Sequence, residues 1–263
     1  MKRLLTGLAV AAALLFAGQV SAQESHLNRI LSDGKLRVGT TGDFIPMSFK
    51  DPGSDEYKGH HIDLARKLAA DMGVDVVFVP TDWKTLINGL VADKYDIVMT
   101  GTSMSVGRAK SAAFTNPIGV TGFLPLVQKK DAGRFSDWES FNKPEVKIAV
   151  NLGTTMVPFI QSQLPNATLV QVESPARDWQ ELLAGRVDAT ITSIVEGSGL
   201  ADRYSNLQLM LQDQIRNSIP LALLVQQGDP TWLTFMNNWI DIQKSTGFLA
   251  ANNKKWNLQG QPY

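Results

Sequence analysis

The sequence contains no cysteine, and this absence removes several kinds of chemistry at once. Disulfides, thiolate nucleophiles and most structural zinc sites require cysteine, so stability has to come from burial of apolar side chains. A lipoprotein anchor is excluded as well, because it needs a cysteine at the signal cleavage point. Neither a glycine-rich phosphate loop nor a Ser-His-Asp arrangement is present, which leaves the common nucleotide and hydrolase motifs without support.

An excess of charge of either sign is also missing. The 25 Lys and Arg residues equal the 25 Asp and Glu residues in number, and 23 remain against 25 without Lys2 and Arg3. Such a balance gives no electrostatic reason to expect nucleic acid or an anionic membrane as a partner.

A single long apolar run occurs, and it lies at the start of the chain. Lys2 and Arg3 precede an apolar stretch over 4–17, and Val20-Ser21-Ala22 follows with small residues where a signal peptidase reads. A membrane anchor is the alternative, but about 20 apolar residues are needed to span a bilayer. The pattern therefore predicts a signal peptide over 1–22, cut after Ala22, and a mature chain in the periplasm.

Extended and helical patterns alternate in two blocks. Each block has the order strand, helix, strand, helix, strand, which predicts a parallel sheet with helices on its faces. The first block has strands at 36–40, 74–79 and 96–99 with helices at 61–72 and 85–92; the second has strands at 146–150, 168–172 and 189–192 with helices at 154–164 and 176–184.

Two apolar extended segments connect the blocks, at 122–128 and 219–225, and helical stretches follow at 231–244 and 249–256. We expect the segments to cross a hinge and the last helices to pack on the first lobe. This predicts lobe 1 over 23–126, lobe 2 over 127–218 and a return to lobe 1 over 219–263. Sheets of this kind bind ligands at the carboxyl ends of their strands, so the cleft between the lobes is the expected site.

A series of short motifs runs through both blocks. They are Leu36-Arg37-Val38-Gly39, Tyr57-Lys58-Gly59, Ile62-Asp63-Leu64-Ala65, Asp96-Ile97-Val98, Ser105-Val106-Gly107-Arg108, Asn116-Pro117 and Leu183-Ala184-Gly185-Arg186-Val187-Asp188-Ala189. The series resembles the amino-acid-type (family 3) periplasmic binding proteins of ABC transporters. That resemblance implies a periplasmic-binding-protein-like α/β fold of type II, with two lobes, two hinge strands and a ligand cleft. It also implies no cofactor, an ABC permease in the inner membrane as partner, and a monomer.

Within this family the chain is most similar to the cyclohexadienyl dehydratases, which act on prephenate and arogenate. In those enzymes the glutamate that matches Glu196 is the general acid. Two other positions differ, because Met156 stands in place of an asparagine and Phe123 in place of a pocket lysine. Losing such an oriented donor costs about 3 kcal/mol of transition-state stabilisation, which counts against dehydratase activity. The shared stretches are Gln23-Glu24-Ser25, Arg29-Ile30-Leu31, Thr40-Thr41-Gly42-Asp43, Pro80-Thr81 with Trp83, Asn151 with Gly153 and Thr155, and Glu196.

The strand-end rule and the resemblance together give the candidate ligand-binding residues. Arg108 is the central one, since a guanidinium can hold a carboxylate through two parallel hydrogen bonds. A surface salt bridge is its alternative role, a turn or helix cap is that of Asp43, and core packing is that of Trp83. The full set is Asp43, Phe44, Trp83, Thr100, Thr102, Arg108, Phe123, Asn151, Thr154, Thr155, Met156, Ser193 and Glu196.

Glu196 has three possible roles. It could be a general acid with a pKa raised by burial, a charged residue that holds an ammonium or hydroxyl group of a ligand, or a helix-capping residue. The aspartate that grips the α-amino group in many amino-acid binders is replaced by Ser193. His60 and His61 adjoin without the spacing of a metal site, and we expect them on the surface at a helix start.

The expected function is therefore capture of a small carboxylated solute for an ABC transporter, the solute being amino-acid-like, a betaine or an organic acid. The alternative is a periplasmic prephenate or arogenate dehydratase that uses Glu196 as its acid.

Overall fold

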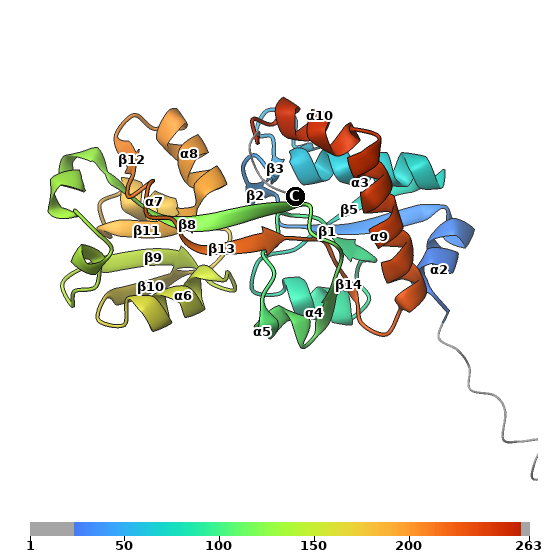
Figure 1. The fold of residues 1–263 in the computed structure, drawn as a ribbon, viewed down its shortest axis with the longest axis horizontal. Helices are drawn as coiled ribbons and strands as arrows, with labels where there is room; N and C mark the ends of the chain where they lie inside the picture. The colour runs from blue at the N-terminus through green and yellow to red at the C-terminus, as the bar shows by residue number, and fades with distance from the viewer. Residues whose placement is uncertain (1–23, 259–263) are drawn as a thin grey trace, which may run out of the picture.

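The structure is a computed structural model that describes residues 24–258, so the expected signal peptide over 1–22 lies outside the described residues. Two α/β lobes lie side by side, and two long strands run from one to the other (Figure 1). The predicted fold class is confirmed by this arrangement. Among the described helices none is both long and apolar enough to cross a bilayer.

Lobe 1 is built on a five-stranded sheet in the order β5-β1-β6-β14-β7. β1 runs parallel to β5 and β6, whereas β14 is antiparallel to β6 and β7. Its strands are β1 (Lys35–Thr40), β5 (Asp75–Pro80), β6 (Ile97–Val98), β7 (Ala112–Phe114) and β14 (Leu224–Gln226), with a small sheet of β2 (Asp43–Phe44), β3 (Ser48–Lys50) and β4 (Tyr57–Lys58). Its helices are α2 (His26–Asp33), α3 (His60–Met72), α4 (Leu86–Val91), α5 (Val106–Ala109), α9 (Pro230–Ser245) and α10 (Phe248–Lys255).

The helical spacing predicted over 61–72 corresponds to α3, which buries Ile62, Leu64 and Leu68 against the lobe 1 core. The tail helices pack on the lobe 1 core. Trp232 of α9 is completely buried, and its Nε1 donates to the backbone oxygen of Asp96 at 3.0 Å.

Lobe 2 repeats the pattern with the sheet order β10-β9-β11-β8-β12. β9 is parallel to β10 and β11, and β8 is antiparallel to β11 and β12. The elements are β8 (Gly119–Gln128), β9 (Lys147–Asn151), β10 (Thr168–Val172), β11 (Ala189–Ser193), β12 (Leu207–Leu209), α6 (Met156–Gln163), α7 (Asp178–Leu183), α8 (Ile194–Arg203) and the short 3-10 helices η1 (Lys129–Arg134) and η2 (Glu139–Phe141).

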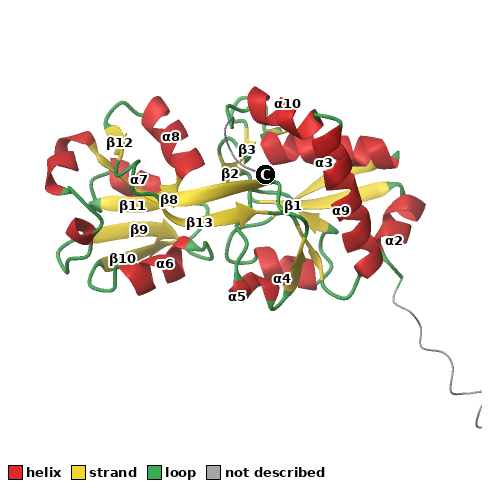
Figure 2. Cartoon of the chain, viewed as in Figure 1, coloured by secondary structure: helices red, strands yellow, loops and turns green. Residues whose placement is uncertain are grey.

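The lobes are joined by β8 and β13 (Arg216–Leu221), which pair antiparallel as they cross between the halves (Figure 2). Thr121 pairs with Ile219 and Gly119 with Leu221 in this ribbon. β8 then continues into the lobe 2 sheet, and the chain after β13 enters β14 of lobe 1. A two-stranded connection allows the lobes to rotate about it, which is the hinge type of domain motion.

Candidate functional site

A pocket lies between the two lobes, and side chains of both line it. Its place between the lobes is where two-lobed α/β proteins bind small molecules. Lobe 1 contributes Phe44, Trp83, Gly101, Ser103 and Arg108; lobe 2 contributes Asn151, Thr154, Thr155, Met156, Arg177, Asp178, Ile191, Ser193 and Glu196; the crossing strands contribute Thr121 and Leu221.

Arg108 is a pocket cation without an acidic partner in the described part of the chain. Its Nη1 donates to the backbone oxygen of Ser103 at 2.9 Å, and its Nη2 donates to that of Gly153 at 3.1 Å. Burial lowers its pKa to about 10, and no carboxylate opposes this shift. The side chain therefore stays charged at neutral pH with N–H groups to spare, which is the state that receives a carboxylate.

Aromatic side chains form the lobe 1 wall beside Arg108. The guanidinium carbon of Arg108 lies 6.0 Å from the ring centre of Trp83, and Phe44 meets the same indole edge-on at 6.1 Å. The indole Nε1 donates to Oδ1 of Asp43 at 3.1 Å, which fixes the plane of the ring. Trp83 therefore lines the pocket, whereas Asp43 is not in the lining and accepts the indole hydrogen bond instead.

Arg177 joins the two lobes through a pair of carboxylates. Its Nη1 lies 2.6 Å from Oδ2 of Asp43 in lobe 1, and its Nη2 donates to Oε1 of Glu196 in lobe 2 at 2.6 Å. Nη1 also donates to the backbone oxygen of Asp43 at 2.9 Å. The sequence pattern does not single out Arg177 or its neighbour Asp178. Both follow β10, Arg177 directly before α7 and Asp178 as its first residue, so the strand-end rule, applied to this strand as well, would have found them.

Glu196 is held from several sides at the start of α8. Ser193 caps this helix and accepts the Glu196 backbone N–H at 3.1 Å, while the Thr192 hydroxyl donates to Oε2 at 3.0 Å. The side chain is almost fully buried, and this burial raises its pKa to about 7. Arg177 acts in the opposite direction, and the carboxyls of Asp178 and Asp43 raise the pKa further.

This pKa predicts a pH dependence of stability. In the folded protein Glu196 keeps its proton up to about pH 7, whereas the ordinary value is 4.5, so between these values the folded state binds more protons. The free energy of unfolding should therefore fall through this window as the pH rises.

We expect Glu196→Gln to flatten that slope in urea unfolding measured from pH 4.5 to 7.5. Glu181→Gln, at an exposed carboxylate that Arg186 stabilises, should keep the wild-type slope; an unchanged slope in Glu196→Gln would contradict the assignment.

Asn151 and Asp178 fix the start of α7, and with it Arg177. The Asn151 amide donates to the backbone oxygen of Ala176 at 3.0 Å, and its Oδ1 accepts the Asp178 backbone N–H at 3.2 Å. Oδ2 of Asp178 accepts from the Thr190 hydroxyl at 2.7 Å, and burial raises the pKa of this carboxyl. Both side chains face the pocket, but their hydrogen bonds serve the protein's own backbone and hydroxyls.

Two of the threonines predicted to bind ligand lie outside the pocket lining. Thr100 is completely buried, and its hydroxyl lies 2.7 Å from that of Thr41; Thr102 is completely buried as well. Gly101 and Ser103, the alternate residues of the same segment, line the pocket in their place. The backbone turns at Gly101, which has φ of +80°, and it places the two threonine side chains in the interior while Gly101 and Ser103 face the pocket.

Phe123 is also absent from the pocket lining. It is completely buried in the lobe 2 core, with its ring edge-on to Phe159 of α6 at 5.2 Å. Thr121, two residues earlier in β8, lines the pocket instead, because α6 covers the strand at Phe123. Met156, by contrast, lines the pocket together with Thr154 and Thr155.

The expectation of surface positions for His60 and His61 is wrong. Both are buried, at 2% and 0% exposure, because the start of α3 packs beneath the β2–β3 turn and against α10. Nε2 of His60 lies 2.6 Å from Oδ1 of Asn253, and Nδ1 of His61 accepts the Gly101 backbone N–H at 3.1 Å. Burial lowers the pKa of His60 to about 4, so this ring is neutral at physiological pH.

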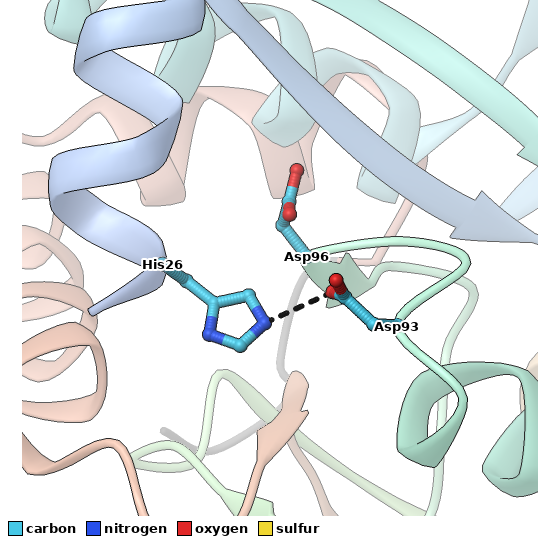
Figure 3. A group of neighbouring side chains, drawn as sticks. All are labelled: His26, Asp93 and Asp96. Carbon is cyan, nitrogen blue, oxygen red and sulfur yellow. Dashed lines mark hydrogen bonds and ion pairs between the residues drawn. The ribbon is translucent and has the colours of Figure 1, made fainter. Parts of the chain in front are cut away.

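His26, Asp93 and Asp96 lie close enough together to resemble a metal site (Figure 3). Their ligand atoms are already taken, because Arg29 donates to both Asp93 oxygens at 2.6 and 2.7 Å and to Asp96 Oδ1 at 2.8 Å. Arg37 adds a second guanidinium at 2.6 Å from Asp96. The cluster is therefore an ion-pair network that ties α2 to the lobe 1 sheet.

Two α/β lobes on a two-stranded hinge, with an unpaired arginine in the cleft between them, define a two-lobed solute-binding protein. The sequence pattern of the bacterial extracellular solute-binding proteins, family 3, matches residues 36–259. The chain belongs to this family, and the family and the solute-binding class predicted from the sequence are confirmed.

Known relatives include both binding proteins and an enzyme. The cyclohexadienyl dehydratase of Pseudomonas aeruginosa is 30% identical over 244 residues, which cover 93% of this chain and 90% of that protein. The L-cystine-binding protein TcyJ of Escherichia coli K12 is 25% identical over 236 residues, 89% and 87% of the two chains. The crystal structure of the ancestral amino acid-binding protein AncCDT-1, a precursor of cyclohexadienyl dehydratase, is similar with a TM-score of 0.81 and 37% identity, over 89% of this chain and 99% of that one.

Proposed function

We propose that this protein captures a small carboxylated solute in its cleft and delivers it to an ABC permease of the inner membrane, acting as a periplasmic monomer. The observation that carries the proposal is the charged Arg108 side chain, which lines the pocket and has no carboxylate partner among the described residues. Arg108 is partly buried, and a cation that is partly withdrawn from water gains from pairing with an anion, so a ligand carboxylate stabilises the closed cleft.

Because both lobes contact the pocket, ligand binding is coupled to closure of the lobes. Arg108 belongs to lobe 1 and donates to Gly153 of lobe 2, and Thr154 and Thr155 of lobe 2 line the pocket near this contact. A ligand that touches both lobes favours the closed arrangement by the difference in its affinity for the two states. Relatives named as binding proteins for L-cystine, glutamine and arginine support this mode of action.

A ligand screen by thermal unfolding tests the proposal. Organic acids, amino acids and betaines are compared with uncharged analogues such as the corresponding amides. A carboxylated ligand at about 100 times its dissociation constant should add about 2.7 kcal/mol of stability. Equal stabilisation by amides and carboxylates would contradict the role of Arg108.

The second candidate function is dehydration of prephenate or arogenate. One observation favours it, since Glu196 is buried with a pKa raised to about 7, as a general acid requires. Its carboxylate is, however, bonded to Arg177 and Thr192, and the pocket lining contributed by residues 24–258 includes no lysine. We therefore expect no enzyme-dependent formation of phenylpyruvate from prephenate, followed by absorbance. Turnover that disappears in Glu196→Gln would establish the dehydratase instead.

We further propose that the chain is exported and cleaved after Ala22. The mature protein purified from the periplasm should then begin at Gln23, which N-terminal sequencing determines. Retention of residues 1–22 in the membrane fraction would show an anchor in place of a cleaved signal.

A further inference from the structure

The pocket contains carboxylates, yet each of them is already bound to the protein. Glu196 and Asp178 are the acidic residues in its lining. Oε1 of Glu196 accepts from Arg177 and Oε2 from Thr192, while the Asp178 oxygens accept from Trp179 N–H at 2.9 Å and the Thr190 hydroxyl at 2.7 Å. An ammonium group placed here would meet no unengaged acidic oxygen.

Arg177 occupies the place between two acids that a ligand cation could take. Its guanidinium lies 2.6 Å from Asp43 and 2.6 Å from Glu196, with 9% of its side chain exposed. It reaches this position from the N-terminus of α7, where Arg177 is the residue that precedes the helix. A single guanidinium bonds to both carboxyl groups, and removing it would leave the buried Glu196 and the partly buried Asp43 without their shared counter-ion.

We propose that Arg177 is a built-in counter-ion that makes the site selective for carboxylates without a cationic group. This inference rests on the proposed function and narrows its ligand class to organic acids, against amino acids and betaines. Arg108 holds the carboxylate, and the acidic side chains that line the described pocket on the lobe 2 side are already hydrogen-bonded within the protein. A ligand that carries one must bury it unpaired or displace Arg177, and both are costly.

Binding of free guanidinium to the Arg177→Ala protein tests directly whether Asp43 and Glu196 form a site for a cation. With the side chain removed, Asp43 and Glu196 should bind free guanidinium, and millimolar guanidinium chloride should raise the unfolding temperature in a saturable way that equal sodium chloride does not. The wild-type protein should show no such increase. Arg186→Ala, which removes an exposed arginine paired with Glu181, is the matched control and should also show none.

The double variant Arg177→Ala/Glu196→Gln should lose the saturable response, because one of the two anions is gone. A folded Arg177→Ala protein that ignores guanidinium, or one that keeps the response without Glu196, would overturn the proposal. This part of the experiment does not involve Arg108, so its outcome is independent of whether carboxylates bind at all.

Ligand pairs with one carbon skeleton provide a measurement on the wild-type protein, in case the alanine variant does not fold. The pairs are propionate with alanine and 3-phenylpropionate with phenylalanine, titrated by calorimetry. We expect the member without the ammonium group to bind at least tenfold more tightly. Equal or tighter binding of either amino acid would refute the selectivity, because the ammonium group would then carry no penalty in the pocket.

Discussion

Replacement of Arg108 by glutamine should lower the affinity for a carboxylated ligand by about 30- to 150-fold. The estimate follows from the loss of charge-assisted hydrogen bonds, worth about 2–3 kcal/mol together, and each 1.4 kcal/mol changes the dissociation constant tenfold. Glutamine retains one amide donor but no charge and no planar fork. Isothermal titration with the ligand identified in the screen measures the effect.

Two further variants separate the causes of that loss. Arg108→Lys keeps the positive charge but not the paired donors, so an intermediate loss is expected. Arg66→Gln is the matched control, because Arg66 also lies in lobe 1 and over an aromatic ring, at 5.7 Å from Phe78, but on α3 away from the pocket. An Arg108→Gln protein that binds like Arg66→Gln would remove the carboxylate site from this pocket.

The fold could be predicted from the sequence because its signals are local. The apolar spacing at Ile62, Leu64 and Leu68 gives a helix, and the extended run over 168–172 gives a strand with the same bounds in the structure. The order of these elements in two blocks then limits the architecture to two α/β lobes, although the antiparallel strands β8 and β14 make both sheets mixed where parallel ones were expected. Local patterns of this kind do not depend on how the lobes meet.

The site was predicted only in part, since several of its contacts depend on how the lobes meet. Arg108 and Glu196 are found at the pocket, where the family resemblance placed them. Arg177 reaches Asp43 across the cleft, 134 positions away in the chain, and no local pattern records such a pair. The burial of His60 has a similar origin, because α10 covers it from the end of the chain.

The structure places Thr100 and Thr102 outside the pocket lining for a different reason. A change of register by one residue exchanges the side chains that face a cleft with those that face the interior. In the segment 100–103, polar residues occur at the positions of both kinds. A sequence pattern with similar residues at successive positions cannot distinguish Thr102 from Ser103. The structure makes the distinction, because Thr102 is fully buried whereas Ser103 lines the pocket.

The second large effect is expected for Gly153→Ala, which should weaken ligand binding at least tenfold although Gly153 carries no side chain. Gly153 of lobe 2 has φ of +87°, and a Cβ atom there would overlap the backbone of Trp83 and Lys84 in lobe 1. Backbone atoms cannot move aside as a flexible side chain can, so the lobes would have to separate. Separation would break the hydrogen bond from Arg108 to Gly153 and lengthen the ion pair between Arg177 and Asp43.

A second glycine of lobe 2 provides the control for backbone strain. Gly185 has φ of +70°, but the nearest atom to its added Cβ is Nε2 of Gln128 at 3.7 Å, which is ordinary contact. Both alanine variants therefore suffer a left-handed backbone cost of about 1 kcal/mol, and only Gly153→Ala also blocks closure. Titration calorimetry should show near-wild-type ligand affinity for Gly185→Ala. Small-angle scattering should show that the lobes of Gly153→Ala stay apart, in the open state, when ligand is added. Equal affinity of the two variants would mean that ligand binding does not require the lobes to meet at Gly153, because the strain alone is common to both.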